Sequence, residues 1–120
     1  GFRAFISWTF QRDGNRLDAV VRDEDMPTSF DYLLTQAVSR IYLDNVPHIQ
    51  SSWVTQGIKV GQVALGFGAD DMGSVMLEEN VVSAAGTTHR TSTEELVHLI
   101  RALGKTPVQR DTRYREVKVL

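Results

Sequence analysis

The stretch IQSSWVTQGIKVGQVALGFGADDMGSVMLEENVVSAAG, residues 49–86, decides the fold of this 120-residue chain. A run from His48 to about Val54 predicts a buried strand. Apolar residues at helical spacing follow it, namely Val60, Val63, Ala64 and Phe67. Gly66 and Gly68 predict the end of that helix, because glycine tolerates the left-handed terminal conformation. Ala69 to Gly73 predicts a further strand, and this order is typical of parallel strands joined by helices.

The residues before this stretch predict the same unit once more. Phe2 to Trp8 is apolar on both faces, which predicts a strand that is covered on both sides. A helix is predicted from Phe30 onward by an apolar stripe that consists of Phe30, Leu33, Leu34, Ala37, Val38, Ile41 and Tyr42. Thr28 with Asp31 predicts the N-terminal cap of this helix, and Pro47 marks its end.

The residues after the stretch predict a third helix and a terminal strand. Ser92 with Glu95 predicts a capping box. The apolar face of the helix consists of Leu96, Leu99, Ile100 and Leu103. Gly104 predicts its end, and Val117 to Leu120 predicts a strand in the tail.

The fold class that follows is α/β, with about three strand–helix units and parallel strands in a single partial domain over residues 1–120. Three units leave the edges of a parallel sheet or barrel uncovered, so we expect self-association through exposed sheet edges. The chain also begins at Gly1 without a methionine and enters a strand-like run at Phe2. We therefore expect a fragment of a longer protein, whose missing N-terminal part would complete the fold.

Composition excludes several classes of function. The chain has a formal net charge of -2, a pI near 5.9 and no basic cluster, so nucleic-acid binding is not expected. No apolar run approaches the roughly 20 residues that cross a bilayer, and we expect a cytoplasmic protein. The chain has no cysteine, which excludes thiolate ligands for zinc or an iron–sulfur cluster within these residues. The three histidines lack metal-ligand spacing and are expected to be structural or solvent-facing, so no metal site is predicted.

Polar residues stand where each predicted strand ends, which is where parallel α/β proteins bind their ligands. The predicted substrate-binding residues are Trp8, Thr9 and Gln11 after the first strand, Gln50, Ser52 and Thr55 around the second, and Asp71 in the third. Gln50 and Ser52 are predicted to share one strand face. Burying an unpaired amide or hydroxyl costs about 1 to 3 kcal/mol, so these groups need partners. A nucleoside-like ligand would supply them, and so would neighbouring backbone in a partly wet core; the residues alone leave both alternatives open.

Glu78 and Glu79 are the predicted catalytic residues, because a carboxylate can act as a general base or bind ribose hydroxyls. Adjacent residues cannot both face one site, so one glutamate at most has this role and the other is solvated. A pair on the surface without any role is the alternative. Trp8 and Trp53 are predicted either to stack on a ring of the ligand or to pack in the core.

Five segments carry a resemblance to a known family: GFRAFISWTFQ, HIQSSWVTQG, VGQVALGFGADDMGS, MLEENVVSAAG and TPVQRDTRYREV. Together they resemble the C-terminal third of the cyclic dehypoxanthine futalosine synthases, radical S-adenosylmethionine enzymes of menaquinone biosynthesis. The resemblance covers essentially the whole chain. Aminofutalosine synthase and the deazaflavin-forming synthase belong to the same enzyme group and share pieces of these segments.

The resemblance implies the last strands of a TIM-like (β/α) barrel that close the substrate side of its cavity. It implies S-adenosylmethionine and a [4Fe-4S] cluster held by a Cys-x3-Cys-x2-Cys loop on early strands, which this cysteine-free chain lacks. The implied reaction, of the oxidoreductase class, is the radical cyclisation of dehypoxanthine futalosine, with Glu78 or Glu79 near the ribose or in proton transfer. The isolated chain is then expected to be inactive. A sister radical enzyme and a non-catalytic α/β module that binds a nucleoside are the alternatives.

Overall fold

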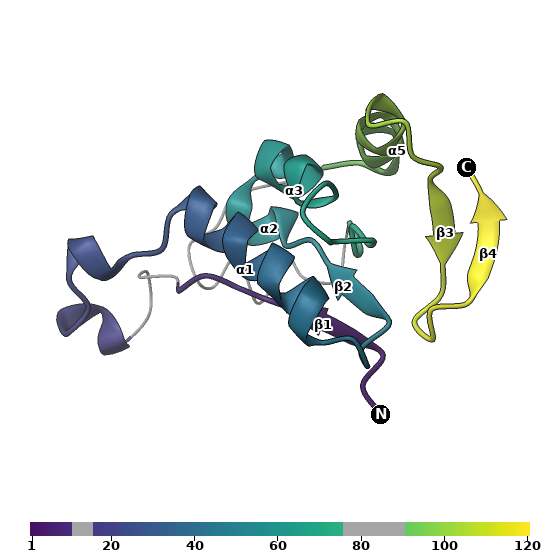
Figure 1. The fold of residues 1–120 in the computed structure, drawn as a ribbon. Coiled ribbons are helices and arrows are strands. Elements are labelled where there is room, and N and C mark those ends of the chain that lie inside the picture. Colours follow the sequence, from purple (N-terminus) through teal and green to yellow (C-terminus); the bar gives the residue numbers. More distant parts are fainter. Residues whose placement is uncertain (11–15, 76–90) are drawn as a thin grey trace.

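The computed structural model describes residues 1–10, 16–75 and 91–120. The elements in chain order are β1 (Ala4–Ile6), η1 (Arg16–Ala19), η2 (Asp23–Asp25), α1 (Ser29–Tyr42), β2 (His48–Gln50), α2 (Trp53–Gln56), α3 (Ile58–Ala64), α5 (Thr93–Ala102), β3 (Val108–Arg110) and β4 (Glu116–Val119). Figure 1 shows the short 3-10 helices at one end of the molecule and the β3–β4 hairpin at the other. Among the described residues, none of these helices is long and apolar enough to cross a membrane.

The sheet at the centre is parallel, as the sequence predicts. β1 pairs with β2 in a register that sets Ala4 beside His48 and Ile6 beside Gln50. The chain at Asp71 continues the sheet through a parallel bridge to Gln50. A backbone bond of 2.7 Å from Ser51 N to Asp71 O supports this third stretch. Three parallel stretches therefore follow one another in chain order, which confirms the α/β class.

Helix α1 begins where its sequence predicts. The Thr28 hydroxyl accepts a hydrogen bond of 3.2 Å from Asp31 N, and the Asp31 carboxylate accepts one of 2.8 Å from Thr28 N. These reciprocal bonds satisfy backbone donors that the first turn leaves unpaired. At the third predicted helix, Ser92 likewise accepts from Glu95 N at 3.2 Å and α5 follows. The N-caps of α1 and α5 are both confirmed.

The predicted strand from His48 to Val54 is wrong in its second half. β2 ends at Gln50, and α2 begins at Trp53. Tertiary contacts turn the chain here: Tyr32 OH accepts a bond of 2.6 Å from Ser52 N, and Ser51 Oγ donates to Gly61 O at 2.8 Å. Ser52 therefore precedes a helix and does not share a strand face with Gln50.

The core lies between the sheet and the helices α1 and α3, and Leu96 of α5 joins it. Its buried apolar residues are Tyr32, Val46, Ile49, Trp53, Val54, Ala64, Leu65, Ala69, Met72, Leu96 and Leu99. Phe5 of β1 packs against this cluster beside Ile49 of β2. Because side chains alternate along a strand, Ile6 and Gln50 point to the opposite face of the sheet. One face is thus the helix-covered face, and we name the other the open face.

The tail forms a hairpin that the sequence predicts only in part. The terminal strand is confirmed as β4, but its partner β3 was not expected. The two strands pair antiparallel, with Val108 beside Val119 and an irregular register near Arg110. The turn between them places Tyr114 at a φ of 63°, a left-handed conformation. Such a conformation is uncommon for a residue that is not glycine.

Candidate functional site

The open face of the sheet carries polar side chains that are nearly buried. Gln50 is 4% exposed, although it belongs to the face that no helix of the described residues covers. Asp71 pairs with Gln50 in register, and paired residues of parallel strands point to the same face. His48, two residues before Gln50, shares that face as well. Amide, carboxylate and imidazole groups are therefore gathered on one side of three parallel stretches.

Asp71 is the most heavily bonded of these groups. Arg110 donates to both of its oxygens, from Nε to Oδ1 at 3.0 Å and from Nη2 to Oδ2 at 2.7 Å. Gly73 N donates to Oδ1 at 3.2 Å, and Tyr114 OH donates to Oδ2 at 3.2 Å. A carboxylate offers about four acceptor positions, so these donors use them all. The Asp71 side chain is 12% exposed.

The ring of Tyr114 contacts two other side chains, the guanidinium of Arg110 and the imidazole of His48. The Arg110 guanidinium lies 3.9 Å from the centre of its ring, and the His48 ring stacks on it at 4.4 Å with an angle of 16°. Burial, together with the Asp71 charge, raises the pKa of Tyr114 to about 12. The hydrogen bond to Asp71 raises the pKa of Arg110, so the guanidinium stays charged.

Gln50 is held from two sides. Gly73 packs directly on its amide: a Cβ at Gly73 would lie 2.3 Å from Gln50 Nε2, and the φ of Gly73 is +74°. Only glycine meets both demands without strain. Beneath Gln50, the fully buried Gln36 of α1 donates from Nε2 to Gln50 O at 3.3 Å and to Tyr32 OH at 2.7 Å. The described residues supply no partner for Gln36 Oε1.

A second polar group lies where β1 and β2 end. The hydroxyls of Ser52 and Thr55 are 2.7 Å apart, and Gln56 Nε2 donates to Thr9 Oγ1 at 2.8 Å. The end of β1 is therefore tied to α2. Trp8 is exposed, so its ring is accessible in this part of the chain.

Asp70, the neighbour of Asp71, has a structural environment. It accepts from Arg40 Nη2 at 2.8 Å and from Ile49 N at 2.7 Å, and His48 Nδ1 lies 2.6 Å from its other oxygen. Arg40 also donates to Gly68 O at 2.7 Å, which joins α1 to the end of α3. This network fixes the third stretch against α1.

The structure brings several of the predicted site residues together. Gln50 and Asp71 meet on the open face. Gln56 donates to both Thr9 and Thr55, and the Thr55 hydroxyl bonds to that of Ser52. Of the two alternatives for Trp53, stacking on a ligand or packing in the core, the structure shows packing in the core. Its Nε1 donates to Met72 O at 2.9 Å. The predicted residues Gln11, Glu78 and Glu79 lie outside the described residues. All of these roles in substrate binding and catalysis stay predictions.

Sequence reasoning missed Arg110 and Tyr114, the partners of Asp71. They lie 39 and 43 residues after it, in a tail that was expected to hold a strand only at its end. The hairpin that carries them has a local signal, an aspartate turn at Asp111 between two short strands in the run VQRDTRYREVKV, but nothing local marks their contact with Asp71. Asp111 accepts from the backbone N of Arg113 at 2.8 Å and of Arg115 at 3.0 Å, a local turn of the kind that aspartate favours.

The described residues contain no cluster of three metal-ligating side chains, and the whole chain contains no cysteine. Thiolates that hold an iron–sulfur cluster are therefore not available from these residues, so the chain does not fit that group.

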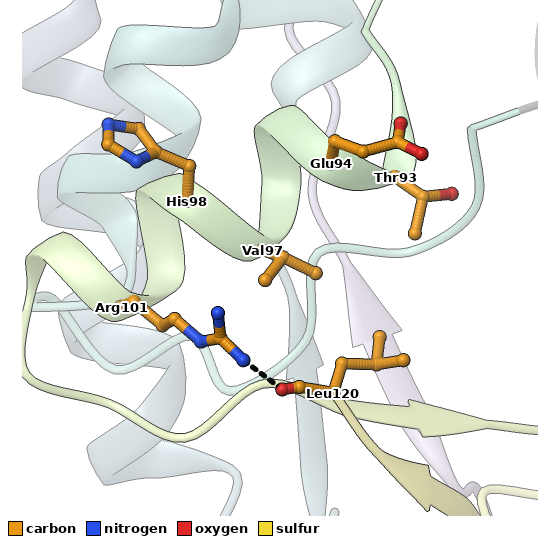
Figure 2. A pocket seen from close by; sticks show the side chains of 6 residues that line it. All are labelled: Thr93, Glu94, Val97, His98, Arg101 and Leu120. Atoms are coloured by element: carbon orange, nitrogen blue, oxygen red, sulfur yellow. Dashed lines mark hydrogen bonds between the residues drawn. The ribbon is translucent and has the colours of Figure 1, made fainter.

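A hollow of about 430 Å³ lies where one face of α5 meets the C-terminal residue, and it is lined by Thr93, Glu94, Val97, His98, Arg101 and Leu120. Figure 2 shows Arg101 reaching across it to the carbonyl of Leu120. His98 is exposed here beside Glu94 and Arg101, which agrees with the solvent-facing alternative for the histidines. None of the predicted site residues lines this hollow, so the open face remains the candidate site.

Comparison with known proteins matches the whole chain to one family model. Residues 1–120 match the family model described as the CofH/MqnC C-terminal region. The chain is 50% identical to a cyclic dehypoxanthine futalosine synthase of Streptomyces coelicolor over 99% of this chain and 29% of the relative. A cyclic dehypoxanthine futalosine synthase of Halalkalibacterium halodurans is 49% identical over 98% of this chain and 30% of the relative. An aminodeoxyfutalosine synthase of Thermus thermophilus is 40% identical over 99% and 32%. The chain spans less than a third of the length of these relatives.

Proposed function

Since this chain belongs to the CofH/MqnC C-terminal region family, we propose that it forms the substrate-side part of a cyclic dehypoxanthine futalosine synthase. The natural protein that carries it would convert dehypoxanthine futalosine to its cyclic product in menaquinone biosynthesis, in the cytoplasm. The choice within the family rests on identity: 50% and 49% to enzymes of that name, against 40% to an aminodeoxyfutalosine synthase.

The polar side chains on the open face and at the ends of β1 and β2 are the observation that carries this proposal. A ligand with a ribose and a carboxylate needs donors and acceptors that converge from several strand ends. Gln50 supplies an amide from β2, and Thr9 and Ser52 supply hydroxyls from the ends of β1 and β2. Such groups on rigid elements hold a substrate in one orientation, which favours a single ring closure.

The remaining parts of the proposal concern residues and cofactors beyond the open face. β1, β2 and the stretch at Asp71 would continue a (β/α) barrel whose other strands lie outside this chain. S-adenosylmethionine and a [4Fe-4S] cluster would be bound by those other parts, since this chain has no cysteine. They would supply the radical chemistry. Glu78 or Glu79 would hold the ribose or accept a proton.

The first experiment uses the natural protein that carries this chain. Its cluster is reconstituted without oxygen, and dehypoxanthine futalosine is supplied with S-adenosylmethionine and a reductant. We expect both 5′-deoxyadenosine and the cyclised product. Deoxyadenosine without cyclised product would move the assignment to a sister radical enzyme. Neither product from a cluster-loaded protein would overturn the proposed activity.

The glutamates are tested one at a time as Glu78→Gln and Glu79→Gln, with Glu116→Gln on the exposed strand β4 as a matched control. Loss of a catalytic carboxylate lowers turnover by roughly 100-fold or more. We expect one of the two variants to show this loss and the control to show none. Unchanged turnover in both variants would remove the pair from the site.

A further inference from the structure

The β3–β4 hairpin is held to the sheet by polar side-chain contacts. All four residues of β4 are exposed, so the strand itself adds little to the core. The contacts that reach the sheet come from Arg110, which binds Asp71, and from Tyr114, which stacks on His48. Arg113 O also accepts from Arg3 Nη1 at 3.3 Å. The hairpin and the open face therefore meet mainly at Arg110 and Tyr114.

The Arg110–Asp71 pair is built to fix a position. Two parallel N–H···O bonds define both the distance and the orientation of a guanidinium and a carboxylate. The third donor group of Arg110, Nη1, binds Asp111 O at 3.0 Å, which ties the pair to the hairpin turn. Because four donors already occupy the Asp71 oxygens, this carboxylate has little capacity left for a ligand. We name the Arg110–Asp71 pair the latch, because its geometry suits holding the hairpin in a fixed position on the sheet.

The latch is connected to Gln50 through the backbone of Met72 and Gly73. Asp71 Oδ1 accepts from Gly73 N, which curls the chain so that Gly73 packs on the Gln50 amide. Met72, between them, accepts the indole N–H of Trp53 and is buried. A displacement of Asp71 therefore moves the surface against which the Gln50 amide rests.

We propose that Arg110 is a positioning residue that acts through Asp71 to hold the Gln50 amide in the orientation that binds the substrate. The inference deepens the proposed function and rests on it. Tyr114 supports Arg110 from the hairpin side. Asp71 then influences the substrate through Gln50 and not by direct contact.

The test compares Arg110→Gln with Arg115→Gln in the natural protein that carries this chain. Arg115 is a matched control in the same hairpin: it donates from Nε to Asp111 Oδ2 at 2.6 Å, but its side chain is 70% exposed and does not touch Asp71. We expect Arg110→Gln to raise the KM for the nucleoside substrate about tenfold or more. The KM for S-adenosylmethionine, which other parts of the protein bind, should stay within about twofold.

A general loss of folded protein would lower kcat and leave both KM values unchanged, and this outcome would overturn the proposal. Arg110→Lys gives a second check, because lysine keeps the charge but not the paired bonds. We expect its KM to fall between those of the wild type and Arg110→Gln. A KM for Arg110→Lys equal to that of the wild type would mean that charge alone suffices, which contradicts the orientation argument.

A double variant tests whether Arg110 acts through Asp71. If it does, Asp71→Asn combined with Arg110→Gln should raise the KM no more than about twofold above Asp71→Asn alone. Effects that multiply would show that Arg110 acts on the substrate by another route and would overturn the proposal.

Amide hydrogen exchange separates this proposal from the proposed function. If the wild type forms no cyclised product, the proposed activity is refuted, but hydrogen exchange can still test whether the Arg110–Asp71 pair holds the chain in place. Gly73 N and Ser51 N both bond to Asp71, so Arg110→Gln should accelerate their exchange about tenfold relative to Arg115→Gln. Equal exchange rates in the two variants would overturn the latch itself.

Discussion

The two faces of the short parallel sheet are built from different parts of the chain. On the helix-covered face, Ile49 is fully buried among residues of α1 and α3. On the open face, the adjacent Gln50 is nearly as buried, but Asp71 beside it is satisfied by Arg110, 39 residues further on. The core therefore gathers apolar side chains from α1, α3 and α5, whereas the candidate site is completed by polar side chains of the hairpin.

The largest expected effect is on the helix-covered face. Ile49→Ala removes a fully buried side chain and leaves a cavity, which costs about 3 to 4 kcal/mol of unfolding free energy. Denaturant unfolding of the wild type and the variant measures this difference. Ile6→Ala is the control on the open face, where the side chain is partly exposed, and should cost about 1 kcal/mol. Equal losses for both variants would break the distinction between the faces.

Gly73→Ala should have the next largest effect, and it acts on the open face. Its φ of +74° is strained for alanine, and the new Cβ would meet the Gln50 amide, so we expect a loss of about 2 kcal/mol together with a raised KM. Gly104→Ala is a matched control, because its φ is +73° and nothing lies within 4 Å of the new Cβ. It should lose about 1 kcal/mol and leave the KM unchanged. The same KM in both variants would refute a role for Gly73 in holding Gln50.

Gln50→Met separates function from stability at a single site. Methionine has a similar length and suits a nearly buried position, so the unfolding free energy should change by less than about 1 kcal/mol. Loss of the amide should lower kcat/KM about tenfold or more, because a substrate group would then lack its partner. Steady-state kinetics and denaturant unfolding of the same preparation measure both effects. Normal kcat/KM would remove Gln50 from the predicted substrate-binding residues.

The contrast between the faces also explains what the sequence could predict. α1, α3 and α5 follow from apolar spacing and from caps such as Thr28 with Asp31, all of which are local signals. The strand boundary at Gln50 could not be predicted, since Tyr32 and Gly61 turn the chain through contacts made far along the sequence. Periodicity does not reveal such contacts.

At the candidate site, the sequence could predict the polar residues but not their partners. Gln50 and Asp71 stand out because polar groups near strand ends are unusual in a sheet core. Arg110 and Tyr114 carry no such mark, as arginine and tyrosine in a short tail are ordinary surface residues. Their role depends on where the hairpin docks, which is a long-range feature of the fold.

Thr28→Ala tests a local signal away from both faces. Loss of the cap should cost about 1 kcal/mol of unfolding free energy at neutral pH.

The hydrogen bond from Thr28 N lowers the pKa of Asp31 below its ordinary value of 3.8. A lowered pKa stabilises the fold above pH 3.8, and this contribution is lost as the pH falls through the folded-state pKa. The stability difference between wild type and Asp31→Asn should therefore shrink in acid; a constant difference would contradict the cap.

The smallest expected effect lies where the hairpin meets the open face, and it is a dependence on alkaline pH. Burial raises the pKa of Tyr114 from 10.0 to about 12, because the phenolate would lie in a poorly solvated place beside the Asp71 carboxylate. A raised pKa stabilises the folded state fully below pH 10, and this contribution is lost as the pH rises toward 12. Tyr114→Phe cannot ionise and should lose less stability over that interval than the wild type. Tyr42→Phe, at an exposed position on α1, should behave like the wild type. Alkaline unfolding measures the loss of stability in each variant, and tyrosinate absorbance measures the ionisation of the tyrosines. Ionisation of Tyr114 near pH 10 would mean that the hairpin does not exclude water from this edge of the open face.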